Sequence, residues 1–327
     1  MYANAIKLFG FFPIHLYGVM IAIGILACFF VLFQYGKYLG FSADDTDFVF
    51  YNGVVAIVVG FFGAAVWQGV YNYIDDIKKG IPNPTFSITG GITVIGGLIA
   101  GAVSFLIGNY IFRKKHYYLV TRLLVYAPCC ITIAHAFGRI GCFFGGCCYG
   151  KPAEGFFSFL GVSFRPGSSA YSQYGNTPLY PTQLFEAAFL FALFGVLSYL
   201  ALKKQYKYNI VVYMVAYSIW RFLIEFVRAD YRGSFLGSLS PSQTQSIILL
   251  FASIGVYFIV RYYNRKMDAD LAEKERLLKL AAARNGEASE TVEAAQASEN
   301  AGEANGEQSV NNAEPSDKTE KIDKQDK

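Results

Sequence analysis

Seven long apolar segments constrain this chain more than any other feature of its sequence. Because each residue of an α-helix rises 1.5 Å, about 20 apolar residues cross the ~30 Å hydrocarbon layer of a membrane. The predicted spans are Ile14–Phe33, Phe48–Val70, Ile92–Ile111, Val120–Phe137, Leu184–Leu202, Ile210–Phe226 and Ile247–Val260. The predicted fold class is therefore all-α, a polytopic integral membrane protein with about seven transmembrane helices.

The charged residues divide the chain into two unlike parts. Residues 1–263 hold 18 basic and 9 acidic residues, whereas residues 264–327 hold 10 basic and 15 acidic residues. We expect a membrane domain over residues 1–263 and a cytoplasmic tail over residues 264–327. Within the tail, Met267–Arg284 is expected to form a short amphipathic helix. Beyond Asn285 the tail is predicted to be disordered, because it has almost no large apolar side chains to bury.

The basic residues of the membrane domain indicate topology rather than a nucleic-acid surface. Cytoplasmic loops carry an excess of Lys and Arg. Three basic clusters fall on one side of the predicted spans: Arg113, Lys114 and Lys115; Lys203, Lys204 and Lys207; and Arg261, Arg265 and Lys266. Lys78 and Lys79 fall on the other side and count against this scheme. The prediction is an N-terminus outside, a C-terminus inside, and no nucleic-acid partner.

One link between predicted spans is much longer than the others. It covers about residues 138–182 and lies on the outer side in the predicted topology. Loops of this length are usually functional or disordered, and this one is rich in aromatic residues. The aromatic residues either line a site or anchor the loop at the depth of the lipid headgroups.

Polar and ionisable side chains lie inside several predicted spans, where they are costly and therefore mark candidate sites. Arg221, Glu225 and Arg228 are spaced by four and three residues, which places them on one helical face. The other members, all in the outer half by the predicted topology, are Tyr17, the glycines Gly90, Gly91, Gly96 and Gly97, His135, Arg139, Gln183, Glu186 and Tyr217.

Two arginines in such a cluster suit an anionic headgroup. The planar guanidinium is always charged and binds phosphate through two parallel hydrogen bonds. Arg139 and Arg221 are therefore predicted to bind the phosphate of an anionic phospholipid. The alternative is an internal network in which Arg221 and Glu225 pair and only hold helices together. The paired glycines of the third span allow close approach of either a helix or a lipid.

The six cysteines fall into two sets. Cys28, Cys129 and Cys130 lie in mid-span and are expected to be inert small apolar residues. Cys142, Cys147 and Cys148 lie at the outer interface in the segment GCFFGGCCYG. They are open to three interpretations: a nucleophile at Cys142 or Cys147, a Cys142–Cys147 disulfide, or a metal site with His135. Because the spacing C-x4-C-C matches no standard zinc pattern, neither a metal nor a cofactor is predicted.

Four short motifs follow one another along the membrane domain. They are HAFGRIG at 135–141, YPTQLFE at 180–186, RFLIEFVR at 221–228 and GSLSPSQ at 237–243. Together with Tyr17-Gly18 and the paired glycines of the third span, they resemble the prolipoprotein diacylglyceryl transferase family. The likeness covers about residues 10–262.

The resemblance implies an enzyme of the bacterial cytoplasmic (inner) membrane whose active site faces the outer leaflet. Family members move the diacylglyceryl group of phosphatidylglycerol to the lipobox cysteine thiol of a preprolipoprotein, and glycerol phosphate leaves. By position, Arg139 matches the headgroup arginine and Arg221 the second essential arginine. Glu225 matches the neighbour of Arg221, and Tyr17 and Tyr217 match family tyrosines. With Gln183, these residues are predicted to bind the lipid phosphate.

Departures from the family pattern concern the acid–base half of the site. Cys142 and Cys147 stand where the family has an asparagine and a glutamate, Ile95 replaces an essential histidine, and Tyr180 replaces another. His135 thus becomes the best candidate for a general base, since histidine has a pKa of ~6.5, and His15 is a lesser one. Two alternatives stay open: a paralogue that transfers a lipid or acyl group to another acceptor through Cys142 or Cys147, or a non-catalytic lipid-binding or redox protein.

Overall fold

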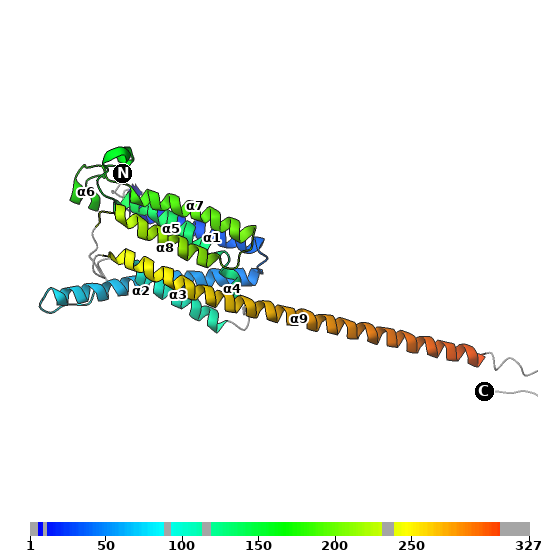
Figure 1. Cartoon of the computed structure of the whole chain (residues 1–327). Helices are drawn as coiled ribbons and strands as arrows, with labels where there is room; N and C mark the ends of the chain where they lie inside the picture. The colour runs from blue at the N-terminus through cyan, green and yellow to red at the C-terminus, as the bar shows by residue number, and fades with distance from the viewer. Residues whose placement is uncertain (1–5, 9–11, 88–92, 113–118, 231–238, 308–327) are drawn as a thin grey trace, which may run out of the picture. The chain divides into compact units, whose positions relative to one another are not determined.

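The computed structural model describes residues 6–8, 12–87, 93–112, 119–230 and 239–307 (Figure 1). Its α-helices are α1 (Leu16–Tyr38), α2 (Ala43–Lys78), α3 (Val94–Ile111), α4 (Leu119–Leu123), α5 (Ala127–Gly145), α6 (Ser169–Tyr174), α7 (Thr182–Leu202), α8 (Asn209–Ile224) and α9 (Pro241–Glu307). Two short 3₁₀ helices are η1 (Gly155–Leu160) and η2 (Glu225–Val227). A small antiparallel pair, β1 (Ile6–Leu8) and β2 (Phe12–Ile14), precedes α1, with Lys7 opposite Pro13.

The helical membrane fold predicted from the sequence is confirmed. Among the described residues, six helices are long and apolar enough to cross a membrane, namely α1, α2, α5, α7, α9 and α8 with its η2 extension. The shorter apolar stretch Gly96–Ile111 of α3 completes the predicted seven. Large apolar side chains such as Leu26, Phe62 and Phe251 are each about two-thirds exposed, at 68%, 66% and 67%. Such a surface suits lipid as the surrounding solvent.

Contacts between helices define how the membrane domain packs. Helix α5 packs against both α1 and α7, and α7 and α5 both contact α8. A second close pair is formed by α2 and α3. The core around α1, α5 and α7 includes Tyr126, Cys129 and Cys130, all nearly inaccessible. Cys129 and Cys130 thus pack as small apolar residues.

The glycines of the third span are used for helix packing. A Cβ atom added at Gly96 would lie 2.3 Å from the Cβ of Trp67, and one added at Gly97 would lie 3.1 Å from the Cβ of Ala64. Both neighbours belong to α2, so these glycines let two helix backbones approach closely. Gly90 and Gly91, together with Arg113, Lys114 and Lys115, lie outside the described residues.

The fourth span differs from its prediction at both ends. The sequence predicts a helix over Val120–Phe137, but the chain breaks after α4 and resumes as α5, which continues to Gly145. Pro128 in the first turn of α5 has no N–H to donate. The Cys129 N–H bonds the Tyr126 carbonyl at 2.9 Å, and the Val125 carbonyl accepts from Asn209 Nδ2 at 2.7 Å. Arg139 and Cys142 therefore lie on a helix. The long segment predicted to face outward, here called the outer segment, begins at Gly146 rather than Gly138.

The end of the chain forms a second unit. By its internal contacts the chain divides into Met1–Asn264 and Arg265–Lys327. Helix α9 continues to Glu307, beyond Asn285, where the sequence predicts that ordered structure ends. Alanine and glutamate, which are frequent in this stretch, favour helix even without a core to pack on.

Candidate functional site

A buried carboxylate, Glu186 in the first turns of α7, is the centre of one ionic group. Its side chain is 2% exposed, and its Oε2 lies 3.1 Å from Arg139 Nε. The Tyr217 hydroxyl of α8 donates to Glu186 Oε1 at 3.1 Å, and His135 Nε2 lies 4.0 Å from the same oxygen. Because a buried charge must be compensated, this group joins α5, α7 and α8. We call it the Glu186 group.

Within the Glu186 group, the contact between Arg139 and Glu186 is an ion pair rather than a directed hydrogen bond. The Nε–H of Arg139 is buried and has no aligned hydrogen-bond acceptor among the described residues. Buried N–H groups almost always have an acceptor in native structures. The side chain of Arg139 therefore retains donor capacity toward an oxygen that the described residues do not supply.

His135 lies one helical turn before Arg139 on α5. Its ring meets the ring of Tyr217 edge-on, with centroids 5.1 Å apart, and Tyr217 is stacked on Tyr213 at 5.9 Å. A distance of 4.0 Å between His135 Nε2 and Glu186 Oε1 is too long for a hydrogen bond. His135 is thus held by ring packing.

A second ionic group surrounds Arg221 at the end of α8. Arg221 Nη1 donates to Glu225 Oε2 at 2.7 Å, and Nη2 donates to Ser242 Oγ at 2.5 Å. The hydroxyl of Ser240 donates to Glu225 Oε1 at 2.8 Å. Glu225 Oε2 also lies 3.5 Å from Arg228 Nε. This Arg221 group connects α8 to the start of α9.

The serines of the Arg221 group were not predicted as site residues. Ser240 Oγ accepts the Gln243 backbone N–H at 3.2 Å, and Gln243 Oε1 accepts the Ser240 N–H at 3.1 Å. This reciprocal arrangement is a capping box at the start of α9, and the spacing S-x-x-Q is its signal in the sequence. Capping places Ser240 and Ser242 beside the ionic pair, while Gly237 and Ser238 lie outside the described residues.

The Glu186 group and the Arg221 group lie near enough for their charges to act on the same side chains. Tyr217 and His135 both lie within electrostatic range of both Arg139 and Arg221. Arginine has five N–H donors, and the contacts to Glu225 and Ser242 use two of those on Arg221. Both guanidiniums therefore keep donors for a further anion in the same region of the helix bundle.

The turn that ends α5 holds three cysteines, Cys142, Cys147 and Cys148. Gly146 has φ +64° and donates its N–H to the Phe143 carbonyl at 3.2 Å, while the Cys147 N–H donates to the Cys142 carbonyl at 3.2 Å. This pair of bonds is a Schellman motif, which brings residue C″ back over residue C3. The motif places Cys147 against Cys142, and the left-handed backbone of Cys148, with φ +64°, continues the turn. None of the three forms a disulfide in the described structure.

The first turn of α7 holds this cysteine turn in place. Gln183 Nε2 donates to the Cys147 carbonyl at 2.6 Å, and Thr182 Oγ1 donates to the Cys148 carbonyl at 2.7 Å. Both side chains are buried, at 1% exposure. Gln183 was predicted to bind phosphate, and in the structure its amide positions the cysteine turn.

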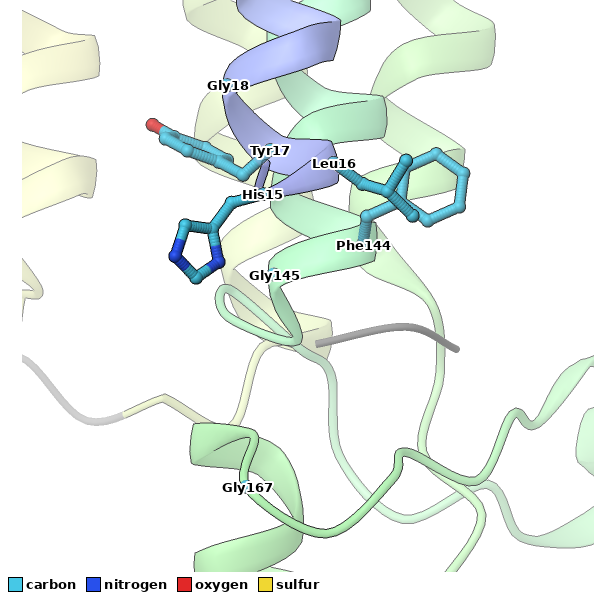
Figure 2. Close-up of a pocket in the computed structure, with 7 residues that line it drawn as sticks. All are labelled: His15, Leu16, Tyr17, Gly18, Phe144, Gly145 and Gly167. Atoms are coloured by element: carbon cyan, nitrogen blue, oxygen red, sulfur yellow. The ribbon is translucent and has the colours of Figure 1, made fainter. Parts of the chain in front are cut away.

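A cavity of about 440 Å³ lies beside the cysteine turn. Figure 2 shows His15 and Tyr17 projecting to one side of the start of α1, while Leu16 and Phe144 lie together on the other side. A Cβ added at Gly145 would lie 3.9 Å from Tyr17 Cδ2 and 4.0 Å from Cys147 Sγ. Tyr17 and His15 therefore line a cavity that adjoins the Cys147 thiol.

The segment that follows the cysteine turn is hydrogen-bonded to η2 and to the residues just after it. The Lys151 N–H donates to the Val227 carbonyl at 2.8 Å, and the Ala229 N–H donates to the Tyr149 carbonyl at 3.2 Å. The Tyr149 hydroxyl donates to Gln173 Oε1 at 2.5 Å, and burial raises the pKa of this phenol. Tyr149 thus remains a donor.

The residues that depart from the family pattern play different parts in the structure. The hydroxyl of Tyr180 donates to the Glu154 carbonyl at 3.0 Å, which anchors the outer segment. The cysteines at 142 and 147 form the turn described above. The side chain of Ile95 lies outside the described part of the chain.

A bundle of apolar helices with two groups of paired arginines and carboxylates defines an integral membrane protein with an ionic site among its helices. The family model for prolipoprotein diacylglyceryl transferase matches residues 3–259. The chain belongs to this family. Its members are diacylglyceryl transferases, so the chain is a multi-pass membrane transferase of lipoprotein biosynthesis.

Several curated relatives share nearly their whole length with this chain. A phosphatidylglycerol–prolipoprotein diacylglyceryl transferase of Clostridium tetani (strain Massachusetts / E88) is 34% identical over 259 residues, which cover 78% of this chain and 96% of the relative. The protein named transferase 2 of Clostridium perfringens (strain 13 / Type A) is 33% identical over 264 residues, covering 80% and 96%. A relative in Dehalococcoides mccartyi (strain ATCC BAA-2266 / KCTC 15142 / 195) is 28% identical over 256 residues, covering 78% and 91%.

Proposed function

We propose that this chain transfers the diacylglyceryl group of phosphatidylglycerol to the lipobox cysteine thiol of a preprolipoprotein. The reaction takes place at the outer leaflet of the bacterial cytoplasmic membrane, with the N-terminus outside and the C-terminal tail inside. The names of the relatives support the donor and acceptor. The observation that carries the proposal for the donor is the buried Arg139 Nε–H, which has no aligned acceptor among the described residues.

The arginines act on the phosphate of the donor. A phosphate oxygen supplies the acceptor that Arg139 lacks, and the remaining donors of Arg221 bind a second oxygen. Glu186 and Glu225 keep the two guanidiniums oriented at 3.1 Å and 2.7 Å. As negative charge develops on the leaving phosphate, these preoriented cations stabilise it.

Bond changes follow from the chemistry of the two substrates. The acceptor sulfur attacks the glyceryl carbon that carries the phosphate, so a C–S bond forms and the C–O bond breaks. The bonding electrons leave with the phosphate oxygen, and glycerol phosphate departs. The acceptor thiol loses its proton, because the thiolate is the nucleophile. His135 is the proposed proton acceptor, and Tyr17 and Tyr217 contact the headgroup.

A reconstituted assay tests this function. The purified chain is placed in phosphatidylglycerol vesicles with a synthetic lipobox peptide, and the peptide mass is measured. The expected product is a peptide that carries one diacylglyceryl group. A peptide with serine in place of the lipobox cysteine should remain unmodified, and so should the cysteine peptide in phosphatidylcholine vesicles. An unmodified cysteine peptide under all conditions would overturn the proposal.

Two variants distinguish a loss of phosphate binding from a general loss of folding. Arg139→Lys keeps the charge but loses the planar fork, and kcat/KM is expected to fall by about 10²–10³-fold. The matched control is Lys151→Ala, an exposed cation of the outer segment, which should retain activity. Complementation in cells depleted of their housekeeping transferase, with lipoprotein lipidation as the readout, tests the same function in vivo.

A further inference from the structure

The cysteine turn brings together three thiols that the proposed reaction does not use. The sulfur atoms of Cys142, Cys147 and Cys148 all lie within 4.8 Å of one another. Two independent features bring the three thiols together. The Schellman motif returns Cys147 over Cys142, and the left-handed backbone at Cys148 continues the turn. A non-glycine residue at positive φ is strained and persists only where its surroundings hold it. Here the buried side chains of Thr182 and Gln183 hold the adjacent carbonyls.

We propose that Cys142, Cys147 and Cys148 bind one thiophilic cation, Zn²⁺ or Cu⁺, through three sulfur ligands. Soft thiolates select these ions. In a tetrahedral zinc site the Zn–S bonds are about 2.3 Å, which places sulfur atoms about 3.8 Å apart. The observed limit of 4.8 Å lies about 1 Å above that spacing, so metal binding would draw the three sulfur atoms closer together.

Two cations lie within electrostatic range of the three thiols. Three thiolates and one divalent cation carry a net charge of −1. Arg139 lies within electrostatic range of Cys142 and Cys148, and Arg228 lies within range of Cys148. Each cation already has a carboxylate partner, Glu186 for Arg139 and Asp230 for Arg228, so the two offset only part of this negative charge. Without metal, the Cys147 thiol instead donates to the Cys142 carbonyl at 3.7 Å.

The ligand set leaves one coordination position open. Among the described residues, no fourth His, Cys, Asp or Glu joins this group. Structural zinc sites are closed by four protein ligands, whereas catalytic sites keep a position for water or substrate. The cavity lined by Tyr17 and Gly145 lies next to the Cys147 thiol and would be the route to that position.

The open position fits the thiol of the acceptor, an assignment that rests on the proposed function. A thiol that coordinates a metal is deprotonated outright. The metal would thus supply the thiolate that attacks phosphatidylglycerol, while the thiol proton leaves to His135 as in the proposed reaction. This role would compensate for the acid–base residues that Cys142, Cys147 and Ile95 replace.

Metal binding is tested first without lipid or turnover. The full chain in detergent is stripped with a chelator under reducing conditions, then loaded with Zn²⁺, Cu⁺ or Co²⁺ in separate arms. We expect one metal per chain by elemental analysis, and sulfur-to-cobalt charge-transfer absorption with Co²⁺. Affinity competition between the Zn²⁺ and Cu⁺ arms identifies the preferred ion. The variant Cys147→Ser should lose the bound metal and the absorption, whereas Cys28→Ala, remote in the sequence, should retain both.

A second, milder variant keeps the test valid if Cys147→Ser fails to fold. Gln183→Ala leaves all three ligands in place but removes the support of the Cys147 carbonyl. Its metal affinity is expected to fall by about 10–100-fold, as for other outer-shell partners. Absence of bound metal in the reduced wild-type chain would overturn the proposal. A Cys142–Cys147 disulfide that forms in preference to the metal complex would overturn it as well.

The role of the open position is tested on the Co²⁺-loaded chain. A lipobox peptide with cysteine should change the cobalt absorption, and the same peptide with serine should not. Identical spectra with both peptides would refute the acceptor role. Because neither measurement uses phosphatidylglycerol, a chain that binds metal but modifies no peptide contradicts only the proposed function. A diacylglyceryl group found on Cys142 or Cys147 after turnover would refute their role as ligands.

Discussion

Replacing Glu186 by glutamine removes the charge at the centre of the Glu186 group while conserving its shape. Glu186 is 1% exposed and compensates Arg139 at 3.1 Å. Leaving one member of a buried ion pair without its partner typically costs about 3–5 kcal/mol. Since about 1 kcal/mol shifts Tm by 2–4 °C in domains of this size, Glu186→Gln should lower Tm by roughly 6–20 °C.

The expected response to lipid distinguishes a phosphate site from a purely structural ion pair. In Glu186→Gln, the phosphate of phosphatidylglycerol can take the place of the lost carboxylate beside Arg139. Phosphatidylglycerol should therefore raise the Tm of the variant more than that of the wild-type chain. Diacylglycerol, which lacks the phosphate, should not produce this difference.

Intrinsic fluorescence suits this measurement, because the chain has two tryptophans. Thermal unfolding is followed in detergent with and without each lipid. The control Glu154→Gln removes an exposed carboxylate of the outer segment, and its Tm should stay close to that of the wild type. If Glu186→Gln unfolds at the wild-type Tm, the carboxylate does not compensate Arg139 and the reasoning fails. Equal stabilisation by both lipids would refute the phosphate site.

Two further substitutions test packing and the Arg221 group. Gly63→Ala places a Cβ 2.3 Å from the Cβ of Ala100 and should lower the free energy of unfolding by about 1–3 kcal/mol. The control Gly195→Ala, whose added Cβ has no atom within 4 Å, should leave stability unchanged or raise it. Equal Tm values for both variants would contradict the close contact between α2 and α3. Ser242→Ala removes the 2.5 Å bond to Arg221 and should lower stability by about 1.5–3 kcal/mol, as for other hydrogen bonds to charged groups. A loss of peptide modification in Ser242→Ala without any change in Tm would instead assign the hydroxyl to substrate contact.

The number of membrane helices could be predicted from the sequence because burial in lipid is a local requirement. A segment must be long and apolar enough to cross the membrane whatever its neighbours are. The same argument made the ionisable residues visible, since charge inside a span is costly and therefore rare. Arg139, Glu186, Arg221 and Glu225 were all found in this way, before their partners were known.

The partners of these residues depended on the tertiary structure. Spacing in the sequence predicted the contact between Arg221 and Glu225, which lie four residues apart in the last turn of α8 and the first residue of η2. The pairing of Arg139 with Glu186 and Tyr217 joins three helices, and no local pattern contains it. Gln183 shows the same limit, because its distance from Cys147 is set by how α5 and α7 pack.

Apolar periodicity also fails where the backbone leaves the helix. The sequence placed the fourth span too early, because the apolar residues before Pro128 resemble a continuous helix. Only the folded chain, with Asn209 bonding the Val125 carbonyl, determines where α5 starts.

The cysteines show most clearly which features the sequence determined and which depended on the tertiary structure. The sequence by itself determined that Cys142, Cys147 and Cys148 lie near one end of a span, because hydrophobicity sets the depth of each residue. Their spacing matched no metal pattern, since such patterns describe particular backbone turns. Only the tertiary structure decided that the three sulfur atoms lie within 4.8 Å of one another. The turn that ends α5 brings them together, and hydrogen bonds from α7 to the carbonyls of that turn hold it in place.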